Sequence, residues 1–424
     1  MCLQSIGVKA VTAIIIIWLC AACGTQNRFT SEMIKVSEKE HFITGFMLYD
    51  PDKKDTLISI NHNKYLNPAS NTKIFTLYSA MKMIGDSIPA IKWKEQNDTL
   101  FLMGTGDPTL LHPWFNSMRV IELINTSSTK KVVLDTGNYL EDKYGPGWAW
   151  EDYAYYFMPE RNSFPMYGNV VNLALSRDAI QVVPDIFAPQ IKKEKQPYSR
   201  SLNKNTFYIT SNKIDSLEVP YITNDSLTMG LLNKHLSKEL VLGKFPPSQL
   251  SSKIHYSIKA DSLYKRMMSV SDNFLAEQMM ILCSGTISDT LSVKKAIDYS
   301  LKNYFSDIPQ YPRWVDGSGL SRYNLFSPHS FVYVLNKMYQ EFDKERLLNL
   351  FPAINLLGET DNDLNLYLYA KPGSFSNNYC LSGYLITKSG KTLIFSFMAN
   401  HFTIPSKEIK RQLQTILLEI RNQY

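Results

Sequence analysis

The sequence predicts an α+β fold whose core is assembled from both ends of the chain. Residues 41–70 read as two strands, and a helical pattern begins at Ser70. Residues 377–402 read as a second hairpin, and an amphipathic helix pattern closes the chain. Between about 90 and 255 the chain instead carries many short strand-like runs and loops. The middle therefore looks like an insertion into a core built from the two ends.

The elements follow in order. A polar turn, Asp50 to Asp55, joins the first two strands. The helix after Ser70 carries apolar residues at helical spacing and ends near Gly85. A helical stretch is expected from about Asp261 to Cys283. In the C-terminal hairpin the turn falls at 388–390. The last helix buries one face, formed by Ile409, Leu413, Ile416, Leu417 and Ile420.

These patterns predict a core domain of residues 23–90 and 256–424. Residues 91–255 would form the inserted region, as one or two small β-rich domains. The basic stretch "QIKKEKQPYSRSLNKN" inside it is most simply a solvated loop.

The amino-acid composition limits the kinds of partner that are expected. The 424 residues are 44% hydrophobic and 20% charged, as in ordinary folded proteins. The net charge of +6 is mild and suits an acidic polymer such as cell-wall material, while no dense basic patch suggests nucleic acid. The seven histidines are scattered, no HExxH motif occurs, and no CxxC motif occurs after Cys23. No metal site is expected.

The N-terminus predicts export. Lys9 precedes an apolar run from Ala10 to Ala22, which is typical of a signal peptide covering residues 1–22. The following Cys23 resembles the acylated cysteine of bacterial lipoproteins, which predicts a membrane-anchored periplasmic protein. Cleavage by ordinary signal peptidase is the alternative. The mature chain then keeps Cys283 and Cys380 besides Cys23, and whether these two pair is open.

Ser70 and Lys73 place a hydroxyl and an amine one helical turn apart at a helix start. A serine there gains from the positive helix end, and the lysine can act as its base if burial lowers the pKa of the amine. The pattern alone is weak, since Ser-x-x-Lys also begins at Ser79, Ser127, Ser128, Ser201, Ser262 and Ser292. Its position between a hairpin and a helix distinguishes Ser70.

Two further polar motifs follow. Ser271-Asp272-Asn273 interrupts an apolar helical stretch, and is either part of a cleft or a helix kink or cap. Lys371-Pro372-Gly373 is preferred over Lys388-Ser389-Gly390, because the latter falls at a hairpin tip where Ser-Gly is ordinary turn chemistry.

In this order Ser-x-x-Lys, Ser-x-Asn and Lys-x-Gly are the signature elements of penicillin-interacting serine enzymes. The chain resembles the class C low-molecular-mass penicillin-binding proteins, the penicillin-binding protein 4 type D-alanyl-D-alanine carboxypeptidase/endopeptidase family. The gap of about 200 residues between Lys73 and Ser271 fits that family and is longer than in β-lactamases. The resemblance is carried by "NPASNTKIFT", "GTGDPTLL", "YGPGWAWED", "SVSDNFLAEQ", "VDGSGLSRYN" and "AKPGSF…LSGYL…FSFMAN".

The resemblance implies a penicillin-binding/serine β-lactamase-like transpeptidase core, an antiparallel sheet flanked by helices, with a large insertion. It makes Ser70 the acylated nucleophile and Lys73 its base. Ser271 would relay a proton to the leaving amine, Asn273 would hold the substrate amide, and Lys371 would bind the terminal carboxylate or support the proton network. The N–H groups of Ser70 and Ser374 would form the oxyanion hole.

In the inserted region "GWAWEDYAYYF" resembles the family's Trp-x-Trp-x-Asp segment, which implies that Asp152 and Phe157 bind the diamino-acid side chain of peptidoglycan. A structural aromatic cluster with a capping acid is the alternative. "DGSGLSR" (316–322) reads as a tight backbone passage near the cleft, with no catalytic role.

The expected function is a serine DD-peptidase that cuts D-Ala-D-Ala or D-Ala cross-link bonds of peptidoglycan stem peptides through an acyl-enzyme, needs no cofactor and is trapped by β-lactams. One alternative is a degenerate homologue that binds peptidoglycan or an envelope partner without turnover; a weaker one is a β-lactamase or esterase. The preferred bond and the oligomeric state are left open.

Pro372 stands where the family usually has threonine or serine. Along a strand the N–H groups of residues i and i+2 point to the same side. If Ser374 donates into an oxyanion hole, the donor absent at Pro372 would also have faced the cleft, not the neighbouring strand. We therefore predict an active-site edge strand that has lost one substrate hydrogen bond, on the order of 1 kcal/mol or more.

Overall fold

The computed structural model describes residues 34–176, 179–209, 216–247, 252–357 and 367–424. The predicted signal peptide (1–22) and Cys23 lie outside these residues. The chain divides into two compact units. Among the described residues, unit 1 holds 34–71 together with Ile308–Pro312 and Leu325–Tyr424, and unit 2 holds Thr72–Asp307 and Arg313–Asn324.

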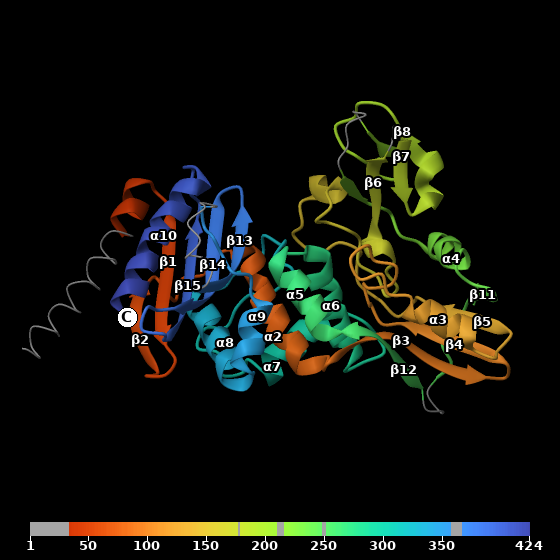
Figure 1. Ribbon diagram of the computed structural model, residues 1–424, viewed down its shortest axis with the longest axis horizontal. Helices are drawn as coiled ribbons and strands as arrows, with labels where there is room; N and C mark the ends of the chain where they lie inside the picture. Colours follow the sequence, from red (N-terminus) through yellow and green to blue (C-terminus); the bar gives the residue numbers. More distant parts are fainter. Residues whose placement is uncertain (1–33, 177–178, 210–215, 248–251, 358–366) are drawn as a thin grey trace, which may run out of the picture. The chain divides into compact units, whose positions relative to one another are not determined.

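Unit 1 is built on an antiparallel sheet in the order β13-β14-β15-β1-β2 (Figure 1). Both predicted hairpins are confirmed, and pairing of β1 with β15 joins the two chain ends in one sheet. Gly390 lies in the β14–β15 turn with φ of 81°, as expected of turn chemistry. The strands are β1 (Ile43–Asp50), β2 (Asp55–Ile60), β13 (Leu368–Phe375), β14 (Asn378–Ile386) and β15 (Thr392–Asn400).

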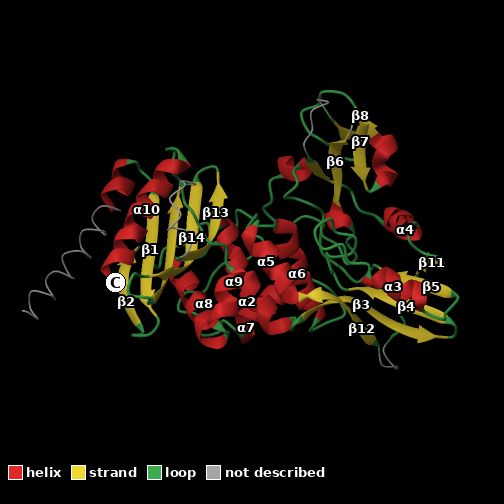
Figure 2. Cartoon of the chain, viewed as in Figure 1, coloured by secondary structure: helices red, strands yellow, loops and turns green. Residues whose placement is uncertain are grey.

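Helices cover both faces of this sheet. The apolar stripe of α10 (Ser406–Gln423) packs on one face, where Phe46 and Phe395 belong to the same buried cluster. The opposite face receives α8 (Pro328–Glu341): the Tyr384 hydroxyl donates to the Leu335 carbonyl at 2.9 Å. The shorter α9 (Lys344–Leu350) follows. The predicted antiparallel sheet flanked by helices is therefore confirmed, and with it the α+β class (Figure 2).

β13 is the edge strand, and its pairing with β14 runs without a register shift through Pro372, which lies opposite Leu381. The Ala370 N–H donates to the Pro352 carbonyl at 3.1 Å, away from β14. Because N–H directions alternate, the backbone nitrogens of Pro372 and Ser374 also face away from β14. The proline therefore costs no ladder hydrogen bond, and the segment is a strand and not a turn.

Unit 2 contains a group of packed helices: α2 (Lys73–Met83), α5 (Ala260–Ser269), α6 (Asn273–Gly285) and α7 (Val293–Asn303). Gly85 follows α2 with φ of 83°, in agreement with the predicted stop. The helical stretch expected from about Asp261 to Cys283 is confirmed on both sides of a break between α5 and α6, where a kink or cap was the alternative interpretation. Asp272 caps α6 there by accepting from the Leu275 N–H at 3.0 Å.

The rest of unit 2 is rich in short strands. One sheet has the order β11-β5-β4-β3-β12 and another the order β10-β6-β7. β3 follows α2 and β12 leads into α5, and the two strands pair antiparallel. The elements are β3 (Ser87–Gln96), β4 (Thr99–Gly104), α3 (Arg119–Thr126), β5 (Lys131–Asp135), β6 (Val170–Ser176), β7 (Ala179–Val183), β8 (Ile191–Lys192), β9 (Phe207–Tyr208), β10 (Leu217–Pro220), α4 (Asp225–Asn233), β11 (Glu239–Leu242) and β12 (Lys253–Lys259).

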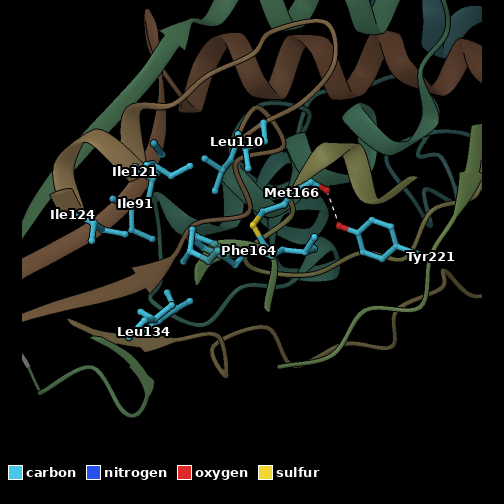
Figure 3. Close-up of a cluster of buried hydrophobic side chains, with 14 of the residues drawn as sticks. Ile91, Leu110, Ile121, Ile124, Leu134, Phe164, Met166 and Tyr221 are labelled. Carbon is cyan, nitrogen blue, oxygen red and sulfur yellow. Dashed lines mark hydrogen bonds between the residues drawn. The ribbon is translucent and has the colours of Figure 1, made fainter. Parts of the chain in front are cut away.

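These strands enclose a second apolar core. Figure 3 shows part of it, with Ile91, Leu134 and Phe164 among the buried side chains. At its margin the Tyr221 hydroxyl donates to the Met166 carbonyl at 2.7 Å, so that this buried polar group keeps a partner (Figure 3). The division of the chain at residues 90 and 255 stays a prediction.

Within the described ranges, Cys283 and Cys380 are both buried free thiols. None of the helices in that part of the chain combines the length and apolarity needed to span a bilayer. No cluster of three or more metal-binding side chains occurs among the same residues.

Candidate active site

Ser70 lies in a strained turn of unit 1. It belongs to the short helix η1 (Ala69–Thr72), directly before α2. Ala69 has φ of 45°, a left-handed conformation that costs a residue other than glycine about 1–3 kcal/mol. The turn is held locally, since Asn67 Oδ1 accepts from the Ala69 N–H at 3.0 Å and Pro68 O accepts from the Asn71 N–H at 3.1 Å. Such strain persists only where the surroundings over-determine the backbone.

The sheet of unit 1 supplies that support. Asn400, at the end of β15, binds both backbone groups of Asn67: Oδ1 accepts from the N–H at 2.6 Å and Nδ2 donates to the carbonyl at 3.1 Å. Cys380 in β14 donates to the same carbonyl at 3.5 Å. Sequence reasoning missed Asn400, although the stretch that contains it was part of the resemblance.

The edge strand lies against the same turn. A Cβ on Gly373 would sit 2.7–2.9 Å from Pro68 O, Ser70 N and Asn71 N, so that only glycine fits there. Asn71 Nδ2 donates to the Lys371 carbonyl at 2.8 Å. Lys371 is fully buried, and its Nζ donates to the Pro372 carbonyl at 2.8 Å. Unit 1 therefore brings Ser70 and the Lys-x-Gly motif together.

Unit 2 brings together the second group of predicted residues. Lys73 begins α2 with a fully buried side chain. Its Nζ donates to Asn273 Oδ1 and to the Ser318 carbonyl, each at 2.7 Å. Asn273 Nδ2 in turn donates to the Phe157 carbonyl at 3.1 Å. Lys73, Asn273 and Phe157 thus form one hydrogen-bonded chain.

Burial lowers the pKa of Lys73 to about 8, and the nearby Asp316, Asp272 and Glu277 carboxylates limit the decrease. At pH 7 roughly one amine in ten is then neutral, which is the form that accepts a proton.

The geometry around Lys73 suits a base. A neutral amine has two N–H bonds and one lone pair. The amide oxygen of Asn273 and the carbonyl of Ser318 are acceptors, and so they bind N–H groups and not the lone pair. These two contacts orient the amine and do not use its lone pair.

Ser271 lies where the chain passes from α5 to α6, with φ of 59°. A serine in the left-handed region is strained, and such strain is concentrated at functional sites. Asp272 caps α6, which agrees with the kink-or-cap interpretation of the Ser271–Asn273 triplet, and Asn273 binds Lys73.

The segment 316–322 forms a tight turn around a buried carboxylate. Asp316 accepts from the N–H groups of Gly319 (2.9 Å) and Ser321 (2.6 Å), from Asn324 Nδ2 (2.7 Å) and from Trp148 Nε1 (2.9 Å). The expected tight backbone passage is confirmed, because a Cβ on Gly317 would lie 2.6 Å from Ala276 O. The sequence interpretation assigned this segment no catalytic role, yet its Ser318 carbonyl binds Lys73.

Sequence reasoning also missed a buried ion pair. Arg161 Nη1 and Glu277 Oε2 are 3.1 Å apart, with side chains 2% and 1% exposed. Glu277 Oε1 accepts from the Ser318 N–H at 2.8 Å. Burial and the nearby Asp316 raise the pKa of Glu277, and Arg161 opposes them. The one signal available was a glutamate inside an apolar helix.

Asp152 lies in the short helix η2 (Trp150–Ala154) and is partly buried. Burial and the neighbouring Glu151 raise the pKa of Asp152, and Arg322 opposes them. The ring of Phe157 stacks on that of Tyr155 at 5.5 Å. Unit 2 therefore places Phe157 beside Asn273, and Asp152 within electrostatic range of the 316–322 turn.

The three motifs on this fold define a serine peptidase of the penicillin-binding class. The chain belongs to the D-Ala-D-Ala carboxypeptidase 3 (S13) family, whose sequence profile matches residues 31–420. The predicted fold, family and enzyme class, a serine-type D-Ala-D-Ala carboxypeptidase/endopeptidase, are confirmed.

Relatives of this chain span nearly its full length. It is 24% identical to D-alanyl-D-alanine carboxypeptidase DacB of Haemophilus influenzae, with 90% of each chain covered. It is 21% identical to penicillin-sensitive carboxypeptidase A of Dictyostelium discoideum, covering 85% of this chain and 83% of the relative. The crystal structure of penicillin-binding protein 4 from H. influenzae superposes with a TM-score of 0.72 at 21% identity, covering 91% of this chain and 98% of that one.

The close approach at Gly373 makes a testable prediction. In Gly373→Ala the added methyl must displace the Ser70 turn, and misplacing a reacting group by about 1 Å costs about 100-fold in rate. We expect the rate constant of acylation by a fluorescent penicillin to fall by about that factor. In the control Gly285→Ala the nearest atom is a side-chain methyl of Leu291 at 3.3 Å, and the rate should stay unchanged. A wild-type rate in Gly373→Ala would contradict the packing argument.

Proposed function

We propose that Ser70 is the nucleophile of this DD-peptidase and Lys73 its general base. The observation that supports this most is the buried Lys73 amine, whose pKa of about 8 and two acceptor partners suit proton abstraction near neutral pH. The position of Ser70, three residues earlier in a strained and sheet-supported turn, suits a nucleophile.

Ser70 Oγ attacks the carbonyl carbon of the scissile D-Ala bond while its proton passes to Lys73. The tetrahedral oxyanion accepts from the N–H groups of Ser70 and Ser374, where loss of a donor costs about 3 kcal/mol. Ser271 relays a proton to the leaving amine as the C–N bond breaks, which leaves an acyl-enzyme. Water then attacks the ester, and Ser70 regains its proton.

Asn273 holds the substrate amide, and Lys371 binds the terminal carboxylate or supports the proton network. The proposed oxyanion role of Ser374 is supported by its N–H, which faces away from β14, and by the contact of Gly373 with the Ser70 backbone. Such a site accepts stem peptides that end in D-Ala and β-lactams that mimic them. The H. influenzae relative has been solved with a bound β-lactam, and that structure superposes with a TM-score of 0.66.

Asp152 and Phe157 are proposed to bind the diamino-acid side chain of the stem peptide. Both residues belong to the predicted inserted region, residues 91–255, whereas the other proposed site residues belong to the predicted core, residues 23–90 and 256–424. The carboxylate would pair with the distal amine. A KM for a diamino-acid peptide that does not rise in Asp152→Asn would remove this role.

We further propose that the protein works in the periplasm, anchored by lipid on Cys23 after removal of residues 1–22. Metabolic labelling with a radioactive fatty acid separates the two processing routes, because ordinary signal-peptidase cleavage leaves Cys23 unlabelled.

The nucleophile is tested with a fluorescent penicillin. We expect covalent label on the wild type and none on Ser70→Ala, which lacks the attacking oxygen. An unlabelled wild type would instead favour a homologue that binds peptidoglycan without turnover. Digestion of purified muropeptides, with identification of the products, then separates carboxypeptidase from endopeptidase activity.

The pH dependence of the acylation rate tests whether Lys73 is the base. Since only the neutral amine of Lys73 accepts a proton, the acylation rate should rise with pH through about 8 and level off above it. Lys73→Arg keeps a cation that does not lose its proton, and should be slow at every pH. A wild-type rate that is constant from about pH 6 to 9 would rule out Lys73 as the base.

The geometry of the edge strand predicts that Pro372→Thr binds the terminal carboxylate of the substrate more tightly. Threonine restores a hydroxyl that can bond the terminal carboxylate, worth on the order of 1 kcal/mol or more, or about fivefold in KM for a D-Ala-D-Ala peptide. The fold should tolerate the change, because residue 372 makes no ladder bond through its nitrogen. Unchanged peptide cleavage and penicillin acylation would show that position 372 does not contact the carboxylate.

A further inference from the structure

A buried ion pair is linked through Ser318 to the proposed base, Lys73. Arg161 and Glu277 are both almost fully buried. Desolvating two charges costs several kcal/mol each, so such a pair is weak evidence of a role in stability. The chemistry proposed above does not use either residue. The contacts of Arg161 and Glu277 indicate a role other than stability.

The two carboxylate oxygens of Glu277 bind different groups. Oε2 faces Arg161, and Oε1 accepts from the Ser318 N–H. The carbonyl of the same Ser318 accepts from Lys73 Nζ. Hydrogen bonds and the backbone of Ser318 thus connect Arg161 through Glu277 to the amine of Lys73.

The turn that carries Ser318 lies between α2 and α6. On the α2 side, the Gly317 carbonyl accepts from Thr76 Oγ1 at 2.6 Å, one helical turn after Lys73. On the α6 side, Gly317 lies so close to Ala276, the residue before Glu277, that a side chain would clash. The Gly317–Ser318 peptide group, which directly precedes the Ser318 carbonyl, is therefore held from both helices, and Glu277 is its contact on α6.

Arg161 is itself fixed. Its Nη2 donates to the carbonyls of Asp142 (3.0 Å) and Tyr144 (3.2 Å), and its guanidinium lies 5.3 Å from the ring centre of Trp148. Trp148 donates to Asp316, which holds the other end of the turn. The ion pair and Asp316 thus belong to one rigid support.

We propose that Glu277, held by Arg161, is a positioning residue that fixes the Ser318 carbonyl as the acceptor for the Lys73 amine. The inference rests on the proposed role of Lys73 as the base, and it adds a residue of α6 whose effect passes through the backbone of Ser318. The other carboxylates that act on Lys73 in unit 2 are Asp316 and Asp272, the latter paired with Arg266 at 3.8 Å.

The test measures penicillin acylation as two quantities: the rate constant at saturation and the concentration that gives half of it. Glu277→Gln keeps an oxygen for the Ser318 N–H, whereas Glu277→Leu removes it. We expect the saturating rate to fall about 10- to 100-fold in the leucine variant, with half-saturation unchanged, and to stay within severalfold of wild type in the glutamine variant.

Two further variants separate positioning from folding. Arg161→Met/Glu277→Leu replaces the pair by apolar groups and should recover thermal stability, but it should stay slow. Glu141→Gln is the matched control: Glu141 is 3.8 Å from Arg161 and caps the Lys294 N–H, with no contact to Ser318 described. It should lose some stability and acylate at the wild-type rate.

A wild-type saturating rate in the folded double variant, or an effect confined to half-saturation, would overturn the positioning role and leave the proposed function standing. An unlabelled wild type would instead overturn the proposed function and this inference with it.

Discussion

The buried amine of Lys73 is the constraint on which the site depends. A lysine with no exposed surface is tolerated only when its N–H groups have partners and its charge is opposed or lost. Asn273 and Ser318 supply the partners, while burial favours the neutral amine and three carboxylates limit that effect. The balance leaves a pKa of about 8, between a permanently charged lysine and a permanently neutral one.

The helix α6 is buried, yet it carries several polar side chains. Asn273, Glu277 and Gln278 all bind groups outside their own helix. Gln278 donates to the carbonyls of Gly106 and Asn162, so that a buried amide ties α6 to the loops of the strand-rich region. Each polar group on α6 would be costly without its distant partner, and the helix thereby serves as a rigid carrier of the site.

The sequence was sufficient for the parts of the site that follow local rules. Hairpins, the helix after Ser70 and the edge strand follow from alternation, turn residues and helical spacing. The Ser271–Asn273 triplet drew attention because polar residues are rare in apolar helices. The break there was predicted only as one of two alternatives, because the apolar residues keep their pattern across it and only the cap of Asp272 marks the boundary. Arg161 and Asn400 were missed for another reason: their partners, Glu277 and Asn67, are 116 and 333 residues away, and no local pattern encodes such a contact.

Neighbouring positions on the edge strand show how differently one motif can be constrained. At residue 372 the backbone nitrogen faces away from β14, and a proline there removes no ladder bond. At residue 373 the α-carbon faces the Ser70 turn, and any side chain would collide with backbone that cannot yield. The strand pairing therefore needs no backbone donor at position 372, while the Ser70 turn requires glycine at position 373. Proline beside glycine is then no sign of a decayed motif. The chain departs from the Lys-Thr-Gly or Lys-Ser-Gly pattern at the position where the fold imposes no requirement, and it retains glycine at the position where the fold does.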